Sequence, residues 1–231
     1  MKALLKTYWP HLLVAAAPLV YIAAVWPQIP DRVPVHFNLH FKPDGYMGKL
    51  AGTLLLPVTS LFVTALVMTW FRFDPKMAKC DPHTREQVQS VLRKCMLAMN
   101  ALLSVLAVGI VYASWGNLTV VAQTIKYGVP LLLLILGNYL GKLKPNYVIG
   151  IRCPWTLESP EVWSRTHRFS GRVLVAMSLG LIAVQIAGIA PATYTILLLG
   201  GLLVWTLLSL GYAFVISRKL GGSGNEKAVE G

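Results

Sequence analysis

Six apolar stretches, each long enough to cross a bilayer as a helix, constrain the fold of this chain more than any other feature. The hydrocarbon core of a bilayer is about 30 Å thick, and a helix needs about 20 residues to cross it. Lipid offers the backbone no hydrogen-bond partner, so each stretch is expected to be helical. We therefore predict an all-α, polytopic membrane protein, a bundle of six transmembrane helices at residues 11–29, 51–71, 95–115, 118–140, 173–190 and 194–217.

The composition agrees with this prediction. Of the 231 residues, 55% are hydrophobic and only 13% are charged, whereas soluble domains carry about 25% charged residues. The net charge of +12 comes from basic residues that bracket the apolar stretches. That placement argues against direct nucleic-acid binding and favours contact with anionic lipid.

Lysine and arginine also predict the orientation. Seventeen lie at the termini and in the loops after the second and fourth spans, and three lie in the loop after the first span. Cytoplasmic loops carry the excess of basic residues, so both termini are predicted to be cytoplasmic. An alternative for the first span is a cleaved signal peptide, because Lys2 and Lys6 precede an apolar core with alanines near its end.

The cysteines give no sign of a disulfide framework or a zinc site. The chain has three, Cys80, Cys95 and Cys153, and no Cys-x-x-Cys pair. An odd number without that spacing argues against both. We expect no cofactor and no metal.

The outer loop, residues 30–50, is predicted to face outward. Alternating apolar residues around Val35, Phe37 and Leu39 predict a short strand, and Pro43-Asp44-Gly45 predicts a turn. Three interpretations of its polar residues stay open: a metal site, structural hydrogen bonds to the backbone, or contact with a ligand. The residues concerned are His36, His40 and Asp44.

The inner loop, residues 137–172, is the longest polar segment. Its stretch 146–152 is predicted to be extended, and Ser159-Pro160-Glu161 predicts a helix start. Arginines at 165, 168 and 172 then form a basic stripe. This pattern predicts an amphipathic helix on the cytoplasmic surface before the fifth span, either as a lipid anchor or in a more specific role.

Two further features concern helix starts and buried charge. Thr84…Gln87 matches a capping box, which predicts that the third helix begins on the cytoplasmic surface. Lys126 lies inside the fourth span, where it either snorkels to the interface or serves a functional pair. Gln123 and Gln185 are candidate partners within the membrane.

The inner loop carries a specific pattern: Lys144-Pro145-Asn146, Gly150-Ile151-Arg152, Pro154-Trp155-Thr156 and Trp163…Thr166-His167-Arg168. This pattern resembles the signature of the SdpI family of bacterial integral-membrane immunity proteins. The outer loop, with Pro-x-His-Phe-Asn…Pro-Asp-Gly-Tyr…Lys, resembles the domain of unknown function that commonly precedes the SdpI segment. That domain often has a glycine about two positions after the asparagine, where this chain has Leu39, His40 and Phe41.

The resemblance implies a multi-pass protein of the bacterial inner membrane that protects against a secreted, membrane-active peptide toxin. It also implies capture of a soluble transcriptional repressor at the membrane. For the outer loop we expect toxin contact by His36, Asn38, Asp44, Tyr46 and Lys49. For the inner loop we expect partner binding or signalling by Asn138, Lys144, Asn146, Arg152, Trp155, Thr156, Trp163, Thr166, His167 and Arg168.

We expect two units and a tail: residues 1–94 with the outer loop (30–50) and a basic loop (72–94), residues 95–220 with the inner loop (137–172), and a disordered tail at 221–231. Two other functions stay open. One is a small-ligand transporter that uses Lys126, Gln123 and Gln185. The other is an intramembrane enzyme with His36 and Asp44, or His167, as acid–base groups; no HExxH or GxSxG motif occurs, so we expect no enzyme.

Overall fold

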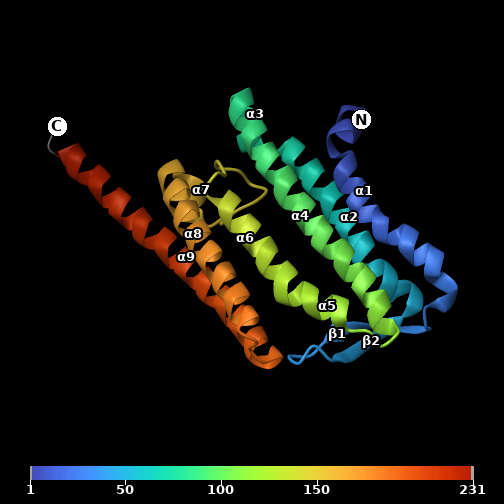
Figure 1. The fold of residues 1–231 in the computed structure, drawn as a ribbon. Helices are drawn as coiled ribbons and strands as arrows, with labels where there is room; N and C mark the ends of the chain where they lie inside the picture. Colours follow the sequence, from blue (N-terminus) through green and yellow to red (C-terminus); the bar gives the residue numbers. More distant parts are fainter. Residues whose placement is uncertain (1, 230–231) are drawn as a thin grey trace.

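A computed structural model describes residues 2–229, with side chains described for residues 8–220. Six of its helical segments are long and apolar enough to cross a membrane, as predicted (Figure 1). In chain order the elements are α1 (Lys2–Val25), η1 (Trp26–Gln28), β1 (Arg32–Phe37), β2 (Pro43–Gly48), α2 (Lys49–Phe73), α3 (Pro75–Lys79), α4 (Pro82–Ser114), α5 (Thr119–Gln123), η2 (Thr124–Gly128), α6 (Val129–Leu140), α7 (Pro154–Glu158), α8 (Pro160–Ile186) and α9 (Pro191–Val229).

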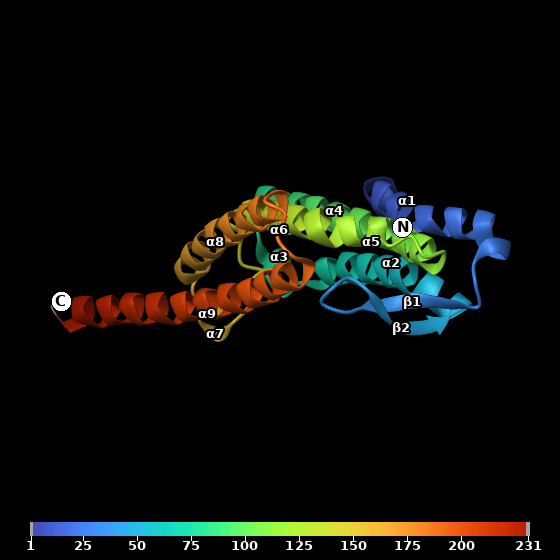
Figure 2. The ribbon, with the colours of Figure 1, turned by 60° about the horizontal axis from the view of Figure 1, so that its bottom comes forward.

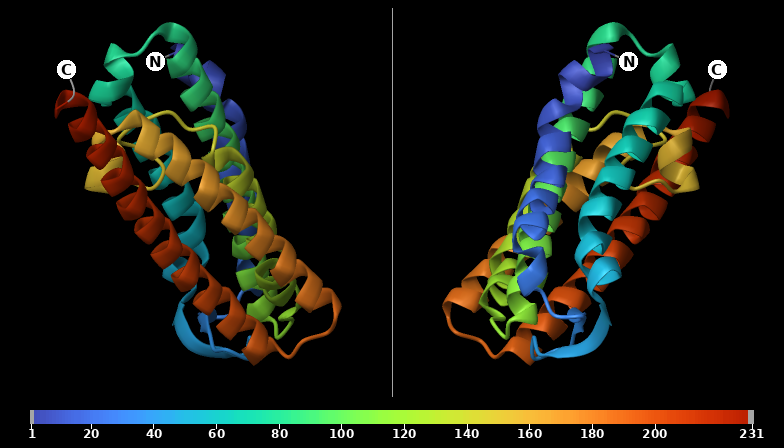
Figure 3. Two further views of the ribbon diagram at one scale, coloured as in Figure 1. Left: turned by 90° about the vertical axis from the view of Figure 1, so that its left-hand side faces the viewer. Right: turned by 90° about the vertical axis from the view of Figure 1, so that its right-hand side faces the viewer.

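Helix α4 is the centre of the arrangement. It contacts α1 and α2 on one side and α5 and α6 on the other (Figure 1). Helix α6 in turn packs against α8, which packs against α9, and α9 lies on the far side of the bundle from α1 (Figure 2). Helix α1 begins and α9 ends at one end of the bundle, and the hairpin of β1 and β2 lies at the opposite end (Figure 3). An even number of spans returns the chain to the side on which it began, and the placement of these two helix ends agrees with that.

A buried polar cluster joins α1, α2 and α4. Asn100 of α4 donates from Nδ2 to Thr64 Oγ1 at 3.0 Å and to the His11 carbonyl at 3.3 Å, and it accepts from Ser60 Oγ at 3.0 Å. His11 Nε2 also lies 2.8 Å from the Arg93 carbonyl. Polar side chains between membrane helices stabilise their association in this way.

Two glycines allow α6 and α8 to approach closely. A Cβ added at Gly171 would lie 2.6 Å from the Gly137 carbonyl oxygen, and one added at Gly137 would lie 3.0 Å from the Gly171 carbonyl oxygen. Both positions therefore require glycine for backbone contact, which is a common device where membrane helices pack.

The outer loop folds into an antiparallel hairpin. Arg32 pairs with Gly48 and Phe37 pairs with Pro43. The strand predicted around Val35, Phe37 and Leu39 is therefore confirmed at Val35 and Phe37, whereas Leu39 lies in the turn. The turn predicted at Pro43-Asp44-Gly45 is wrong, because these residues begin β2. The chain has already turned at residues 38–42, where Asn38 Oδ1 accepts from the N–H groups of His40 and Lys42 at 2.9 and 3.1 Å.

The helix starts differ in part from the predictions. Helix α4 begins at Pro82 because Asp81 caps it, accepting from the Thr84 N–H at 2.9 Å, so the cap predicted at Thr84 is wrong. That hydrogen bond also lowers the pKa of the Asp81 carboxyl. The start predicted at Ser159 is confirmed, since its hydroxyl accepts from the Val162 N–H.

Three predicted segment boundaries fall within continuous helices of the structure. The predicted surface helix and the fifth span form one continuous helix, α8, because nothing interrupts its hydrogen bonds after Pro160. The unit boundary predicted between residues 94 and 95 falls inside α4, whose first turns extend beyond the third span. Helix α9 continues to Val229, which includes most of the predicted disordered tail, and residues 230–231 lie outside the described part.

The fourth span contains a π-helical turn, η2, between α5 and α6. Pro130 follows it and has no N–H to donate to the Lys126 carbonyl four residues before. The Tyr194 hydroxyl of α9 takes over this role at 2.9 Å and also lies 3.2 Å from the Ile125 carbonyl. A side chain of one helix thus supplies the hydrogen-bond donor that the carbonyl groups in the irregular turn of another helix lack.

Candidate functional site

The inner loop is held by a buried aspartate that the sequence analysis did not single out. Asp74 is 0% exposed; its Oδ1 caps α3 through the N–H groups of Lys76 and Met77, and its Oδ2 accepts from the Tyr147 N–H at 2.7 Å. The Lys76 ammonium donates to the Leu157 carbonyl and lies 5.0 Å from the Tyr147 ring centre. The end of α2 therefore fixes the position of the inner loop.

Asn146 shapes the loop from within. Its side chain is fully buried and accepts from the N–H groups of Val148 and Ile149, both at 2.8 Å, while its amide donates to the Lys144 carbonyl at 2.9 Å. The extended conformation predicted for 146–152 is therefore wrong at residues 147–150, where the chain bends. Asn146 thus acts on the loop conformation.

His167 and Trp163 form a stacked pair inside the protein. Their ring centres lie 4.0 Å apart, both side chains are 0% exposed, and Trp163 Nε1 donates to the Leu143 carbonyl at 2.8 Å. His167 Nε2 accepts from the Ile151 N–H at 3.0 Å, and Nδ1 lies 2.8 Å from the Trp163 carbonyl. These partners require the neutral tautomer with the proton on Nδ1. Trp163 therefore packs in the protein interior.

Gly150 makes the contact with His167 possible. Its φ of +117° is in a region that favours glycine, and an added Cβ would lie 2.5 Å from His167 Nε2. The glycine thus lets the backbone reach the histidine ring and present the Ile151 N–H to it.

The start of α7 completes the inner loop. The Thr156 hydroxyl donates to the Ile151 carbonyl at 2.8 Å and accepts from the Cys153 N–H at 3.1 Å. Next to it, Trp155 meets the ring of Phe214 edge-on, with centres 5.2 Å apart. The loop therefore contacts α9 as well as α2 and α8.

Burial divides the predicted inner-loop residues into two sets. Five are buried and belong to the loop's internal structure: Asn146, Thr156, Trp163, Thr166 and His167. Trp155 is half-buried, and four are exposed on the surface: Asn138, Lys144, Arg152 and Arg168. Arg152 donates to the Tyr147 carbonyl from this surface. Only the second set can contact a partner directly.

The polar residues of the outer hairpin lie in three places. His36 Nδ1 is 2.6 Å from Asp44 Oδ1 across the two strands, with His36 73% and Asp44 43% exposed. Tyr46 is exposed on β2, Asn38 holds the turn, and the Lys49 ammonium lies 4.6 Å from the Trp26 ring centre. His40 does not join His36 and Asp44: no group of three or more potential metal ligands gathers among the described residues.

The hairpin turn is anchored to the end of α8 and the start of α9. Phe41 is only 6% exposed and packs with Leu181, Tyr194 and Leu198, its ring centre 6.4 Å from that of Tyr194. Its φ of +59° is in the left-handed region, which residues other than glycine rarely adopt. The Thr195 hydroxyl donates to the Leu39 carbonyl at 3.2 Å.

The three predicted intramembrane residues do not form one cluster through hydrogen bonds in the described structure. The Lys126 ammonium lies 5.7 Å from the Phe41 ring centre, at the hairpin end of the bundle. Gln123 is exposed, and Gln185 is buried on α8 with its Oε1 lacking a protein partner.

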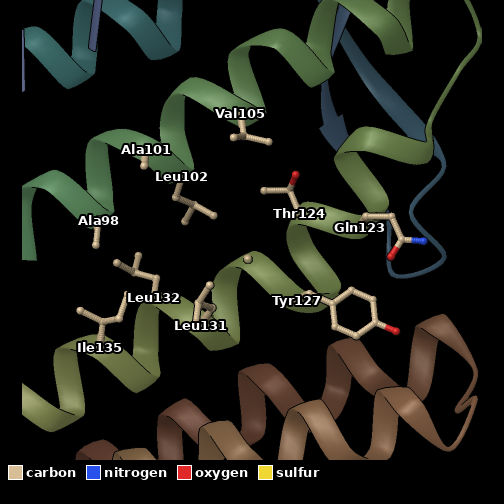
Figure 4. Close-up of a pocket in the computed structure, with 11 residues that line it drawn as sticks. Ala98, Ala101, Leu102, Val105, Gln123, Thr124, Tyr127, Leu131, Leu132 and Ile135 are labelled. Carbon is tan, nitrogen blue, oxygen red and sulfur yellow. The ribbon is translucent and has the colours of Figure 1, made fainter. Parts of the chain in front are cut away.

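A groove of about 430 Å³ lies between α4 and the fourth span (Figure 4). Leu102 and Val105 line one wall, and Leu131 and Ile135 line the other. The polar ends of Gln123 and Tyr127 lie at one end of it (Figure 4). Its lining suits acyl chains or apolar side chains and offers little to a polar substrate.

The residues that sequence reasoning missed had weak signals. Asp74 precedes a proline, which is typical of a helix cap, and Asn100 is an amide inside an apolar span. Neither position reveals its partner, because Tyr147 and Thr64 are distant in sequence.

Comparison with known proteins gives two consecutive matches. A model of the SdpI/YfhL protein family matches residues 142–213, which include most of the inner loop, α8 and much of α9. A model of a domain of unknown function, DUF1648, matches residues 13–61, which include the hairpin. No solved structure matches the chain.

Two proteins of Bacillus subtilis (strain 168) are similar to this chain. One is "Immunity protein SdpI", 26% identical over 203 residues, which are 86% of this chain and 90% of that protein. The other is "Uncharacterized membrane protein YbgB", 30% identical over 66 residues, 28% of this chain and 69% of that protein. With six apolar spans and both family segments in order, the chain belongs to the SdpI family of multi-pass bacterial membrane proteins and carries the DUF1648 segment at its N-terminal side.

Proposed function

We propose that this protein protects its cell against a secreted, membrane-active peptide toxin, with the outer hairpin as the surface that meets the toxin. The similarity to an immunity protein over 86% of the chain supports this function. One observation carries the assignment of the surface. The hairpin is anchored by Phe41 to α8 and α9, yet it keeps His36, Asp44 and Tyr46 exposed.

The hairpin offers a toxin both polar and aromatic contacts. His36 and Asp44 form a hydrogen-bonded pair on the exposed side of the strands, and Tyr46 is 49% exposed on β2. Such a surface binds a peptide through a carboxylate, an imidazole and an aromatic ring. Asn38 and Lys49 maintain the turn and the base of the hairpin, so their contribution is mainly to its shape.

The inner loop is the second part of the proposal: it holds a soluble partner, such as a transcriptional repressor, at the cytoplasmic side. Lys144, Arg152 and Arg168 are exposed there and present three positive charges. The buried Asn146 and His167 keep the loop in one conformation. A rigid basic surface of this kind favours an acidic patch on a partner protein.

Survival of sensitive cells tests the toxin role. A toxin-sensitive bacterium that expresses the chain is challenged with a panel of purified bacterial membrane-active peptides, at matched membrane levels of each variant. We expect wild type and Asp31→Ala to protect and Asp44→Ala to fail, since Asp31 is an exposed acid outside the His36–Asp44 pair. Equal protection by Asp44→Ala and wild type contradicts the assignment of the hairpin.

The inner-loop role needs a separate readout. Arg152→Ala is expected to keep protection and to lose recovery of a soluble partner with the membrane fraction, with Lys79→Ala as a control for charge on the same side. If Arg152→Ala abolishes protection instead, the inner loop contributes to immunity itself and the two roles are not separable.

A further inference from the structure

A polar hollow of about 600 Å³ opens between α4, α6 and α8, at the end of the bundle that carries the termini. The first turns of α4, the end of α6 and the start of α8 form its walls. Its charged lining residues are three lysines, Lys94, Lys142 and Lys144, and we name it the lysine hollow. The toxin contact proposed above does not use it, and the partner contact shares only Lys144 with its lining.

Two of these lysines are brought to one aromatic ring. The ammonium groups of Lys94 and Lys142 lie 5.4 and 4.7 Å from the ring centre of Tyr139. Each ammonium is stabilised by the same ring, while the two like charges repel. An anion that contacts both lysines would replace this repulsion with two favourable contacts.

No carboxylate neutralises the lysine hollow from within its lining. The nearest acids along α4 and α8 are already paired, Glu86 with Arg93 at 2.7 Å and Glu161 with Arg165 at 2.6 Å. The hydroxyls of Ser90 and Ser164 supply further donors in the lining. Three cations with hydroxyl donors and no acid suit a phosphate group.

The position of the lysine hollow points to a lipid phosphate. Tyr139 is in the last turn of α6, and Lys94 immediately precedes the predicted third span, so both lie at the level where headgroups meet the bundle. Lys142 also borders a second, neighbouring groove between α6 and α8, where Val175 and Leu179 lead toward the membrane interior. A lipid with its phosphate at Lys142 can place an acyl chain along that groove.

We propose that the lysine hollow binds the phosphate headgroup of an anionic phospholipid. Basic pockets between transmembrane helices on the cytoplasmic side have the chemistry that such headgroups require. Lys94 and Lys142, which share the Tyr139 ring, contact the phosphate, and Lys144 adds a third positive charge in the lining. The bound lipid occupies the hollow between α4, α6 and α8 and neutralises its lysines.

Native mass spectrometry of the full chain in a neutral detergent tests this site. The protein is titrated with phosphatidylglycerol, with phosphatidylcholine as the zwitterionic comparison. We expect one phosphatidylglycerol to bind more tightly than phosphatidylcholine, and Lys94→Ala and Lys142→Ala each to weaken it about fivefold. Lys79→Ala removes the same charge from an exposed position outside the hollow and is expected to leave binding unchanged.

Three results would overturn the proposal. If Lys79→Ala weakens binding as much as Lys142→Ala, the attraction is to overall charge. If Lys142→Arg, which keeps the charge and so guards against a folding artefact, fails to restore binding in a folded protein, a cation at this position is not the contact. If inorganic phosphate at the same concentration displaces the lipid and shields Lys94 and Lys142 from acetylation equally well, the site belongs to a free anion.

Discussion

Asp74 Oδ2 accepts a hydrogen bond from the Tyr147 N–H at 2.7 Å, across 73 residues of sequence. Asp74 ends α2 and caps α3, so one buried carboxylate joins the DUF1648 side of the chain to the SdpI side. With Lys76 on the Leu157 carbonyl, it fixes the inner loop from the first half of the chain. The halves are therefore one structural unit at this end of the bundle.

Replacing Asp74 with alanine is expected to loosen the inner loop. Three N–H groups lose their acceptor, and the loss is about 3 kcal/mol because hydrogen bonds to a buried carboxylate are among the stronger ones. Thermal unfolding in detergent measures the loss of stability, and the rate of trypsin cleavage near Arg152 measures the loosening of the inner loop. The control Asp81→Ala removes a helix cap that is exposed to solvent and should lower stability less; equal effects of the two changes would contradict the joining role.

Gly150→Ala is expected to disturb the His167 contact. Alanine at a φ of +117° is strained by roughly 1–3 kcal/mol, and its Cβ would lie 2.5 Å from His167 Nε2. The melting temperature should fall, whereas Gly180→Ala, where a Cβ meets nothing within 4 Å, should leave it unchanged or raise it. In a His167→Ala background the cost of Gly150→Ala should shrink, and full additivity would show that the two residues do not interact.

The sequence predicts most of the fold because the membrane leaves few choices. Length and apolar character determine where the helices lie, and charge counting predicts which ends share a side. Prediction from the sequence fails where several local signals for a turn or a helix start compete. Pro43-Asp44-Gly45 is a good turn sequence, but the Asn38 side chain already closes a turn before it. Thr84 is a good cap, but Asp81 followed by proline starts the helix first.

The candidate site was predictable in outline only. The pattern from Lys144 to Arg168 indicates a specific inner loop, but sequence spacing cannot show that His167 faces Ile151 or that Asn146 is buried. Those facts depend on where the loop folds back on α8. Asp74 and Asn100 act through partners distant in the chain, and no local pattern reveals such pairs.

Asn100→Leu is expected to weaken the packing of α1 and α2 on α4. The change removes bonds to Ser60, Thr64 and the His11 carbonyl, each worth about 0.6 kcal/mol in membrane interiors, so a loss of roughly 1–2 kcal/mol follows. Asn138→Leu makes the same replacement at an exposed position of α6 and is the matched control. Detergent unfolding curves compare the two; if Asn100→Leu is neutral, apolar packing alone holds these helices.

Phe41→Ala is expected to release the hairpin turn from α8 and α9 while the bundle stays folded. The ring is buried against Leu181, Tyr194 and Leu198, and truncating a buried phenylalanine costs about 3–5 kcal/mol. The loss should be local, because the hairpin's own strand pairing does not depend on this ring. Faster hydrogen exchange at the Phe41 and Lys42 amides, with α4 unchanged, would report it.

Leu39→Ala is the control for this change, because its side chain lies in the same turn but is 45% exposed. Survival under toxin challenge then separates two roles of the hairpin, its attachment to α8 and α9 and its contact with the toxin. Phe41→Ala should lose protection together with the docked hairpin, and Asp44→Ala should lose protection while exchange at the turn stays slow. If Phe41→Ala undocks the hairpin and still protects, its attachment to α9 is not required, and toxin contact alone by the hairpin accounts for immunity.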